Sequence, residues 1–341
     1  MPDSLPIHVQ QIKGTSLTFG VIYDPHFSDA TPQSRKDDYP KALWDKMLWV
    51  EQDLRANGAS FLLFTGDITH KSTMSTKFVC TAVRFFRDYA VPIYGIAGNH
   101  DVYAGSTDFM NRTSLGILFA SGVIRKLEHL RIEGAKGFSV HVRGFDYAPA
   151  FHVKKPALLD LQEAAPWAKS PPRWHLAVAH GFTHKTHSQF TTKDYVNVPS
   201  FSDAGYHALF LGHDHVPYEP EVVGKTLLCR GGSLSRGTKH LYQRARNVQY
   251  HLVTVDETDI EVTARPIPCA PPEDVYSEQQ IEREDLDLKL RHFIQKFKES
   301  KTTAAAEDDI YSIIEGLDGT DPEVKQLCFQ YLQQAGVIRQ G

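Results

Sequence analysis

The sequence predicts an α/β fold in which parallel strands alternate with helices. Short apolar runs at residues 17–23, 61–64 and 91–97 are typical of buried strands, and segments with helical spacing separate them. Strand, helix, strand, helix, strand is the order of a right-handed parallel βαβαβ unit. Each of these strands is followed by residues that can bind a metal or move a proton, as at 98–101. Open α/β sheets place their chemistry at that edge.

The helices are predicted from apolar residues that recur at helical spacing. The stripes are Leu43, Met47, Val50 and Leu54 for the first helix, and Phe78, Ala82, Phe85, Phe86 and Tyr89 for the second. A third helix is expected over about residues 107–121. Residues 1–16 are expected to be an irregular lead-in.

The second half of the chain adds further strands and one short helix. Strands are expected at residues 123–130, 138–145, 174–179, 206–211, 221–223, 226–230, 248–255 and 260–266, and a helix at 157–165. The polar stretch 181–202 suits a loop over a site, because loops of that length in compact domains usually have a function.

Composition changes after residue 266, which divides the chain into two predicted units. Four prolines within residues 266–272 indicate a linker, and short helices with apolar stripes are expected between 277 and 336. We therefore predict a catalytic domain over residues 1–266. A linker and a helical appendage follow over residues 267–341.

Composition and charge narrow the class of protein. The chain has 341 residues, 41% of them hydrophobic and 23% charged, as expected for a soluble globular protein. A net charge of -4 gives no general attraction to nucleic acid, so DNA binding would need a local patch or a partner. The four scattered cysteines suit reduced thiols in the cytoplasm. No apolar run approaches the ~18 residues of a membrane span, so no membrane association is expected.

Seven oxygen and nitrogen donors follow the predicted strands. They are Asp24, His26, Asp67, Asn99, His180, His213 and His215. A set without thiolates suits Mn, Fe or Zn and argues against a structural cysteine zinc site. Seven donors are too many for one ion. They suit two ions about 3.5–4 Å apart that share a carboxylate, an arrangement that stabilises both oxygens of an in-line phosphoryl displacement.

Five motifs carrying these donors resemble those of the calcineurin-like metallophosphoesterases. The motifs are Asp24-x-His26, Gly66-Asp67-x-x-His70, Gly98-Asn99-His100-Asp101, His180-Gly181 and Gly212-His213-x-His215. They span about residues 17–216 and agree with the family in order, spacing and residue type. The resemblance implies a four-layer α/β/β/α sandwich of two mixed sheets with a dinuclear metal site at the strand ends.

The resemblance also implies a role for each residue. The implied ligand sets are Asp24, His26 and His215 for one ion and Asn99, His180 and His213 for the other, with Asp67 bridging them. His100 would be the acid that meets the leaving group, with Asp101 near it. His70 is grouped with these two as a catalytic residue. Mn is the expected metal, with Mg, Fe and Zn as alternatives.

Within the family, the chain is more similar to the SbcD-type nuclease subunits of double-strand-break repair complexes. His70 in the second motif, the Gly232-Ser233 turn and an appendage behind a proline-rich linker carry this likeness. Phe27-Ser28 departs from it, because that subfamily often has Leu-Gly there. The likeness implies that the C-terminal helices dock an SMC-like ATPase; a second copy of the chain is the alternative.

Three residues outside the motifs are predicted to contact substrate. His184 and Lys185 lie in the polar stretch just after the ligand His180. Arg236 belongs to the one basic cluster near the site, where phosphate contact and a solvated face are the two alternatives.

The motifs together predict a Mn-dependent phosphodiesterase that hydrolyses DNA, as an exonuclease or a single-strand endonuclease. In this mechanism activated water attacks phosphorus and His100 protonates the leaving oxygen. A phosphatase or a cyclic-nucleotide phosphodiesterase on the same scaffold is the alternative enzyme. A metal-free interaction scaffold is disfavoured, because it would have no need of seven donors.

Overall fold

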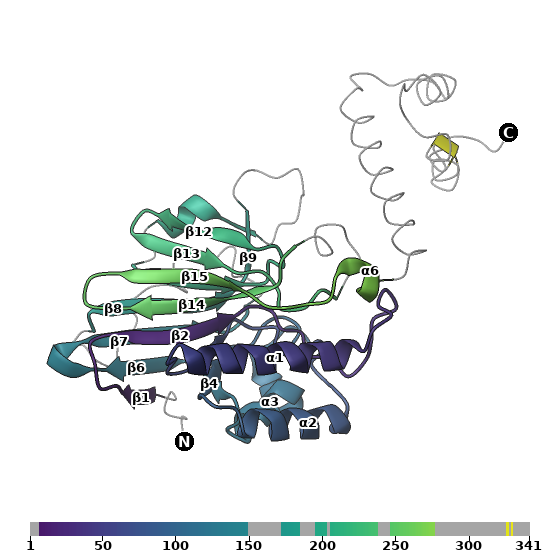
Figure 1. The fold of residues 1–341 in the computed structure, drawn as a ribbon, viewed down its shortest axis with the longest axis horizontal. Helices are drawn as coiled ribbons and strands as arrows, with labels where there is room; N and C mark the ends of the chain where they lie inside the picture. The colour runs from purple at the N-terminus through teal and green to yellow at the C-terminus, as the bar shows by residue number, and fades with distance from the viewer. Residues whose placement is uncertain are drawn as a thin grey trace.

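Two stacked β-sheets form the centre of the protein (Figure 1). The computed structural model describes residues 7–148, 172–184, 195–202, 205–237 and 246–276, together with residues 325, 326 and 329. Both sheets are mixed, and helices pack on one of them. The prediction of an α/β fold with two mixed sheets is therefore confirmed.

The first sheet has six strands and holds the predicted βαβαβ unit. Its strands are β2 (Leu17–Ile22), β3 (Leu62–Phe64), β4 (Ile93–Gly95), β5 (Arg125–Lys126), β14 (Gln249–Val255) and β15 (Ile260–Pro266). They lie in the order β15-β14-β2-β3-β4-β5. β2 to β5 are parallel, and β14 is antiparallel to both of its neighbours. The carboxyl ends of β2, β3 and β4 consequently meet at one edge.

The second sheet has seven strands and brings the later motifs to the same edge. They are β1 (Ile7–Gln11), β6 (His129–Glu133), β7 (Ser139–Phe145), β8 (Trp174–His180), β11 (Ala208–Gly212), β12 (Tyr218–Val223) and β13 (Thr226–Arg230). Their order is β1-β6-β7-β8-β11-β13-β12, with β7, β8, β11 and β13 parallel. Two short strands, β9 (Phe182–His184) and β10 (Tyr195–Asn197), pair separately.

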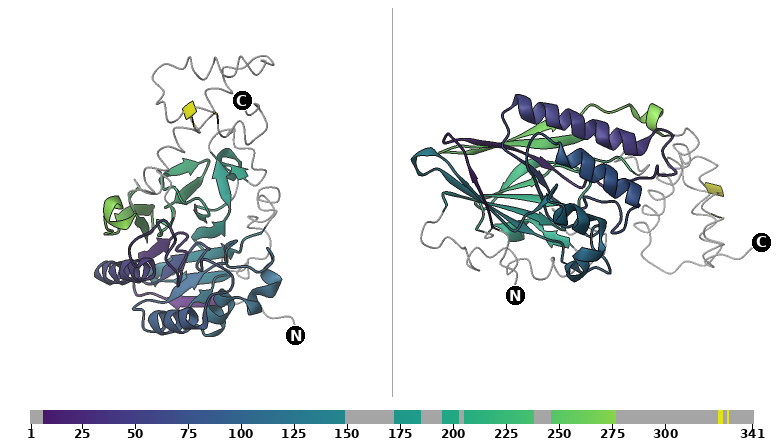
Figure 2. Two further views of the ribbon diagram at one scale, coloured as in Figure 1. Left: turned by 90° about the vertical axis from the view of Figure 1, so that its right-hand side faces the viewer. Right: turned by 90° about the horizontal axis from the view of Figure 1, so that it is seen from below.

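Helices α1 (Tyr39–Ala56), α2 (Thr76–Arg87) and α3 (Ser114–Ala120) cover the outer face of the six-stranded sheet. α1 begins where the Asp38 carboxylate accepts a hydrogen bond from the Lys41 backbone, and it ends at Asn57. Its predicted stripe is buried against Leu62 and Phe64. Figure 2 shows these helices stacked on the sheets. None of the described helices is long and apolar enough to cross a membrane.

The core between the sheets draws its side chains from both. Phe19 and Leu63 come from the first sheet, and Val142, Leu176 and Phe210 from the second, all fully buried. β3 is buried on both faces because helices cover its other side, which explains its unbroken apolar run. On the outer face of the second sheet, the described cover is the 3₁₀ turn η3 (Val198–Phe201) with Tyr206.

Two local predictions were wrong. Residues 1–16 are not simply irregular, because β1 pairs with the edge strand β6. The helix expected at 107–121 is two helices, since η1 (Thr107–Arg112) ends before Thr113 and the Thr113 hydroxyl caps α3 by accepting from the Gly116 backbone at 3.0 Å. A further 3₁₀ turn, η2 (Ala135–Gly137), connects β6 to β7.

The C-terminal region is described only in part. α6 (Pro272–Val275) follows the predicted linker start, and Ile267, Val275 and Tyr276 are buried. The helix predicted at 157–165 and most of the stretch 277–336 lie outside the described residues. The division into two units therefore stays a prediction.

Candidate metal centre

The strand ends of both sheets bring the predicted donors together at one edge. Asp67 follows β3 and lies at the centre of the group. One of its oxygens is 3.5 Å from His26 Nε2, and the other is 3.5 Å from His180 Nε2. The Asp67 carboxylate thus faces two sets of nitrogen donors at once.

These donors form two groups that share Asp67. The first holds His26, Asp67 and His215, and the second holds Asp67, His180 and His213. Within each group, the ligand atoms all lie within 4.8 Å of one another. Such spacing is what a bound cation needs. The grouping separates His26 and His215 from His180 and His213, as in the two sets that the family resemblance implies, but it does not include Asp24.

Asn99 completes the second group. Its Oδ1 lies 3.0 Å from His180 Nε2 and 2.8 Å from His213 Nδ1. The Thr65 carbonyl can only accept, so His180 Nδ1, 2.9 Å away, carries the hydrogen. With a cation bound, His180 would be neutral and would present the Nε2 lone pair to it beside Asn99 Oδ1.

In the first group, two imidazole nitrogens lie close together. His26 Nε2 and His215 Nε2 are 2.9 Å apart, and both rings are largely buried. Asp24 is fully buried nearby, but it falls outside both groups of close ligand atoms. Its two carboxylate oxygens accept from the His213 backbone, each at 2.9 Å. Asp24 therefore fixes the position of His213 as well as standing beside the site.

The backbone at the donors is strained. Left-handed φ angles of 40°, 47°, 47° and 93° occur at Asp24, His26, Asp67 and His213. Among the described non-glycine residues, only Ala104 and Lys136 share a positive φ. Left-handed backbone costs about 1–2 kcal/mol per residue and clusters at functional sites. The chain thus turns sharply where each strand stops, so that each side chain is aimed into the site.

Close approach of the loops requires glycine at two positions. A side chain at Gly98 would collide with the Asp67 backbone and carboxylate. One at Gly66 would come within 2.5 Å of His180 Nδ1 and 2.9 Å of Gly98 Cα. These contacts explain the glycine that precedes Asp67 and Asn99 in their motifs.

Asp101 lies beneath the site rather than in it. Its carboxylate is fully buried and accepts hydrogen bonds from the backbones of Ile68, Thr69 and Gly98, at 2.7–3.0 Å, and from the Thr69 hydroxyl. Burial raises its pKa. Asp101 therefore ties the loop after β3 to the loop after β4, which is a positioning role.

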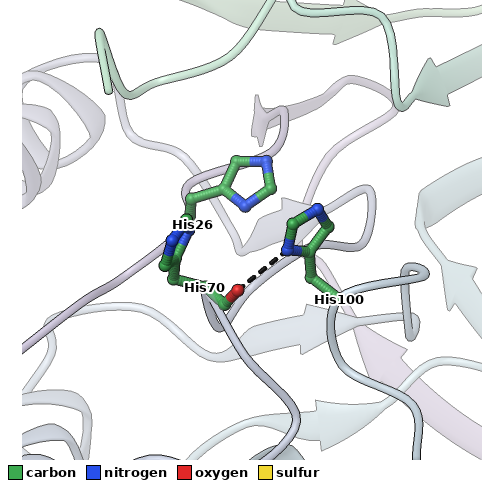
Figure 3. A group of neighbouring side chains, drawn as sticks. All are labelled: His26, His70 and His100. Carbon is green, nitrogen blue, oxygen red and sulfur yellow. Dashed lines mark hydrogen bonds between the residues drawn. The ribbon is translucent and has the colours of Figure 1, made fainter. Parts of the chain in front are cut away.

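His100 and His70 form the open rim of the site, beside His26 (Figure 3). The His100 backbone donates to Asp67 Oδ1 at 2.8 Å, and its Nδ1 donates to the His70 carbonyl at 2.8 Å. Its Nε2 is left as the atom that can exchange a proton. The His100 ring centroid is 4.7 Å from that of His26. This placement fits the acid predicted from the sequence.

Electrostatics in the site depend on burial and on Asp67. Burial lowers the pKa of His213 to about 3 and that of His215 to about 4, so both are neutral and able to bind metal. Burial also lowers the pKa of His180, but attraction to the Asp67 carboxylate outweighs burial and raises that pKa to about 9. Burial raises the pKa of Asp24 well above its usual range. Divalent cations would favour the neutral imidazole and the charged carboxylate instead.

The predicted substrate residues are placed less fully. His184 ends β9, directly after the β8 motif, and Lys185 lies outside the described residues. Arg236 is 4% exposed, and its guanidinium donates to the Ala270 carbonyl. This hydrogen bond holds the chain between β15 and α6 against the rest of the domain. A role of these three in substrate binding stays a prediction.

Ser233 is a site residue whose role sequence reasoning missed. Its hydroxyl donates to the Asp24 carbonyl at 2.7 Å, and its backbone N–H donates to the His215 carbonyl at 3.3 Å. Ser233 also bridges Tyr23, so it joins the ends of the two sheets. The Gly232-Ser233 turn was the available signal, although it gave no role.

The donor set fits two divalent ions. Carboxylate, amide and imidazole atoms converge in two groups, and the Asp67 carboxylate belongs to both. When bound, such ions activate water and neutralise charge on phosphoryl oxygens. Asp24, His26, Asp67 and His215 would hold one ion, and Asp67, Asn99, His180 and His213 the other.

Comparison with known proteins places this geometry in a family. The chain matches the calcineurin-like phosphoesterase family over residues 17–217. The calcineurin-like phosphoesterase YfkN from Bacillus subtilis is 14% identical, with a TM-score of 0.44 over 80% of this chain and 97% of that one. A dimetal phosphatase from Danio rerio is 12% identical, with a TM-score of 0.45 over 73% and 96%. Comparison with curated protein sequences gives no match. With more than half of its length matched, the chain belongs to the calcineurin-like phosphoesterases, which hydrolyse phosphoesters with divalent metals.

Proposed function

We propose that the protein is a two-metal phosphodiesterase that cleaves DNA, as an exonuclease or a single-strand endonuclease. The observation that carries hydrolysis of a phosphoester is the Asp67 carboxylate shared by two donor groups, with His100 beside them. The DNA substrate rests on the likeness of the motifs to SbcD-type nucleases. Mn is the proposed metal, one of the ions, with Fe and Zn, that a set of oxygen and nitrogen donors without thiolates suits.

His100 supports hydrolysis of alkyl phosphoesters, the class to which DNA belongs. An alkoxide leaving group has a high pKa and needs a proton as it departs, which a positioned imidazole can supply. The His70 carbonyl holds the His100 ring by Nδ1, so Nε2 is the atom that meets the leaving oxygen. Asp101 contributes by fixing the two loops from which Asp67, His70 and His100 project.

We infer the partner from the same likeness and a cytoplasmic location from the cysteines. We assign the helices predicted over residues 277–336 to docking an SMC-like ATPase, since a chain of net charge -4 needs help to hold a polyanion. A homodimer through those helices is the alternative. The described cysteines Cys80, Cys229 and Cys269 are free thiols, which suits the reducing cytoplasm.

The second candidate is a phosphatase or a cyclic-nucleotide phosphodiesterase. The same metal groups support it. It is also favoured because the described arginines near the site bind other groups of the protein rather than facing a DNA backbone. Arg230 donates to Thr183 and Glu221, and Arg246 donates to the Ser235 carbonyl, so both contact the protein itself.

One panel of substrates decides between the candidates. Purified protein with Mn, Mg or Zn is assayed on single-stranded DNA, duplex DNA, a cyclic nucleotide and a phosphomonoester. We expect Mn-dependent cleavage of single-stranded DNA that is lost in Asp67→Asn, which controls for contaminating nucleases. Rapid monoester turnover without DNA cleavage would overturn the DNA assignment in favour of the second candidate.

A further inference from the structure

A hollow of about 360 Å³ opens beside His70, between the loop of residues 28–33 and the segment of residues 70–75. Its volume is at the lower end of the range for small-molecule sites, about 300–1,000 Å³. His70 connects the hollow to the metal centre, because it lines the hollow while its carbonyl accepts a hydrogen bond from the His100 ring. The rings of His70 and His100 are stacked at 5.7 Å. The hollow therefore begins beside the residue that holds the His100 ring.

Hydrogen bonds hold both walls of the hollow in place. In the first wall, the Ser28 hydroxyl donates to the Ala30 carbonyl at 3.0 Å and accepts from the Ala30 backbone at 3.1 Å. In the second, the Met74 backbone donates to the Ser114 hydroxyl at 2.7 Å. The walls are joined where the Ser75 backbone donates to Asp29 at 3.3 Å. The hollow is thus formed before any substrate arrives.

The lining is polar but nearly neutral. Hydroxyl groups come from Ser28, Thr31, Thr73 and Ser75, and apolar surface comes from Pro32 and Met74. Lys71 and Asp29 are its one cation and one carboxylate, apart from His70. A channel for successive phosphates would be lined by several cations. The lining suits instead a group that offers hydroxyls and one flat apolar face.

We propose that this hollow binds the nucleoside that carries the leaving oxygen. This inference rests on the proposed function and adds to it a subsite for one sugar and base. The hydroxyls of Thr31 and Thr73 contact the sugar, Met74 packs on the base, and Lys71 donates to a carbonyl oxygen of the base. A nucleoside seated there is unpaired, so single strands and frayed ends are favoured over internal duplex.

The test compares two diesters that differ in the leaving group. Thymidylyl-thymidine releases a nucleoside, whereas methyl p-nitrophenyl phosphate releases nitrophenol. We expect Lys71→Met/Thr73→Val to lower the ratio of their kcat/KM values by about tenfold or more, since each of the two lost hydrogen bonds is worth about fivefold. The change should lie mainly in KM for the dinucleotide. Lys13→Met, an exposed lysine in the turn between β1 and β2, should keep the wild-type ratio.

A binding measurement separates this inference from the proposed function. Thymidine alone is titrated into the wild-type protein and the double variant and followed by saturation-transfer NMR. Binding that the double variant loses supports the subsite, even for a protein that cleaves neither diester. Equal binding by both proteins, no binding by either, or an unchanged kcat/KM ratio overturns it.

Discussion

Asp67 holds one oxygen toward His26 and the other toward His180, each at 3.5 Å. Because a single carboxylate serves both donor groups, Asp67→Asn should weaken both sites and abolish hydrolysis. Loss of a ligand to one group alone, as in His26→Ala, should leave one ion partly bound. Metal analysis of the purified proteins measures this directly. Equal metal content in wild type and Asp67→Asn would contradict a bridging role.

His100 should affect leaving-group departure and not metal binding. His100→Ala keeps the backbone N–H that donates to Asp67, so both ions should remain bound. We expect cleavage of an alkyl diester to fall by about 10²–10⁴-fold, the usual contribution of a general acid. The loss should be much smaller for a nitrophenyl diester, whose leaving group departs without a proton. An equal loss on both substrates would mean that His100 positions the phosphate instead.

Residue types and spacing were enough to predict which side chains gather at the site, but not the role of every one. The sequence could not distinguish the role of Asp101 from that of His100, because the direction of a side chain depends on the turn that carries it. The structure turns its carboxylate to the backbones of Thr69 and Gly98. Arg236 was expected near substrate from its charge alone. Its burial against Ala270 depends on how the chain after β15 folds back, which no local pattern reveals.

At the scale of elements, Asp53 of α1 fastens the helix to β14 and β15. Its carboxylate accepts from Tyr250 Oη and from two nitrogens of Arg265, at 2.6 and 3.0 Å. Hydrogen bonds from Arg265 hold the pKa of Asp53 below its usual range. The stabilisation is therefore complete above the pKa of an unfolded aspartate, about 3.9, and is lost as pH falls through the lower folded value.

Asp53→Asn should consequently cost stability near neutral pH but little in acid. We expect a loss of about 1 kcal/mol at pH 6, because the Arg265 side chain is 37% exposed and partly screened. Urea unfolding of both proteins from pH 6 to pH 3 measures the difference. Asp45→Asn, in an exposed pair with Lys41, serves as the control and should change little. A constant difference across the pH range would contradict this account.

The elements that sequence predicted well are those covered on both faces. β3 and β8 are nearly continuous apolar runs because helices or the other sheet bury each side. β1 escaped notice because it is an edge strand with exposed Ile7 and Val9 and no buried face to impose a pattern. The break at Thr113 was missed because helical spacing continues across it, and a single hydroxyl cap decides the boundary.

For the whole molecule, the buried Tyr276 marks where the domain can be cut. Its hydroxyl donates to the Arg236 carbonyl at 2.9 Å, and the Val275 carbonyl accepts from the Lys36 backbone. Removal of residues 277–341 should leave hydrolysis of a small chromogenic diester intact while lowering activity on long DNA, since those residues are the proposed docking segment. Gel filtration and both assays on the truncated protein test this. An insoluble truncated protein would show that the segment belongs to the core.

Donors from two separate sheets also determine when the site can form during folding. Asp24, Asp67 and Asn99 follow strands of the six-stranded sheet. In the seven-stranded sheet His180 ends β8, and His213 and His215 follow β11. We expect the two halves to meet late in folding, because the sheets dock through contacts distant in sequence. Metal ions should therefore slow unfolding while leaving the refolding rate almost unchanged, because interactions absent from the transition state act on the unfolding step. Stopped-flow refolding and unfolding with and without Mn would reveal this asymmetry. In such a protein the metals stabilise the folded state after it has formed and do not nucleate folding.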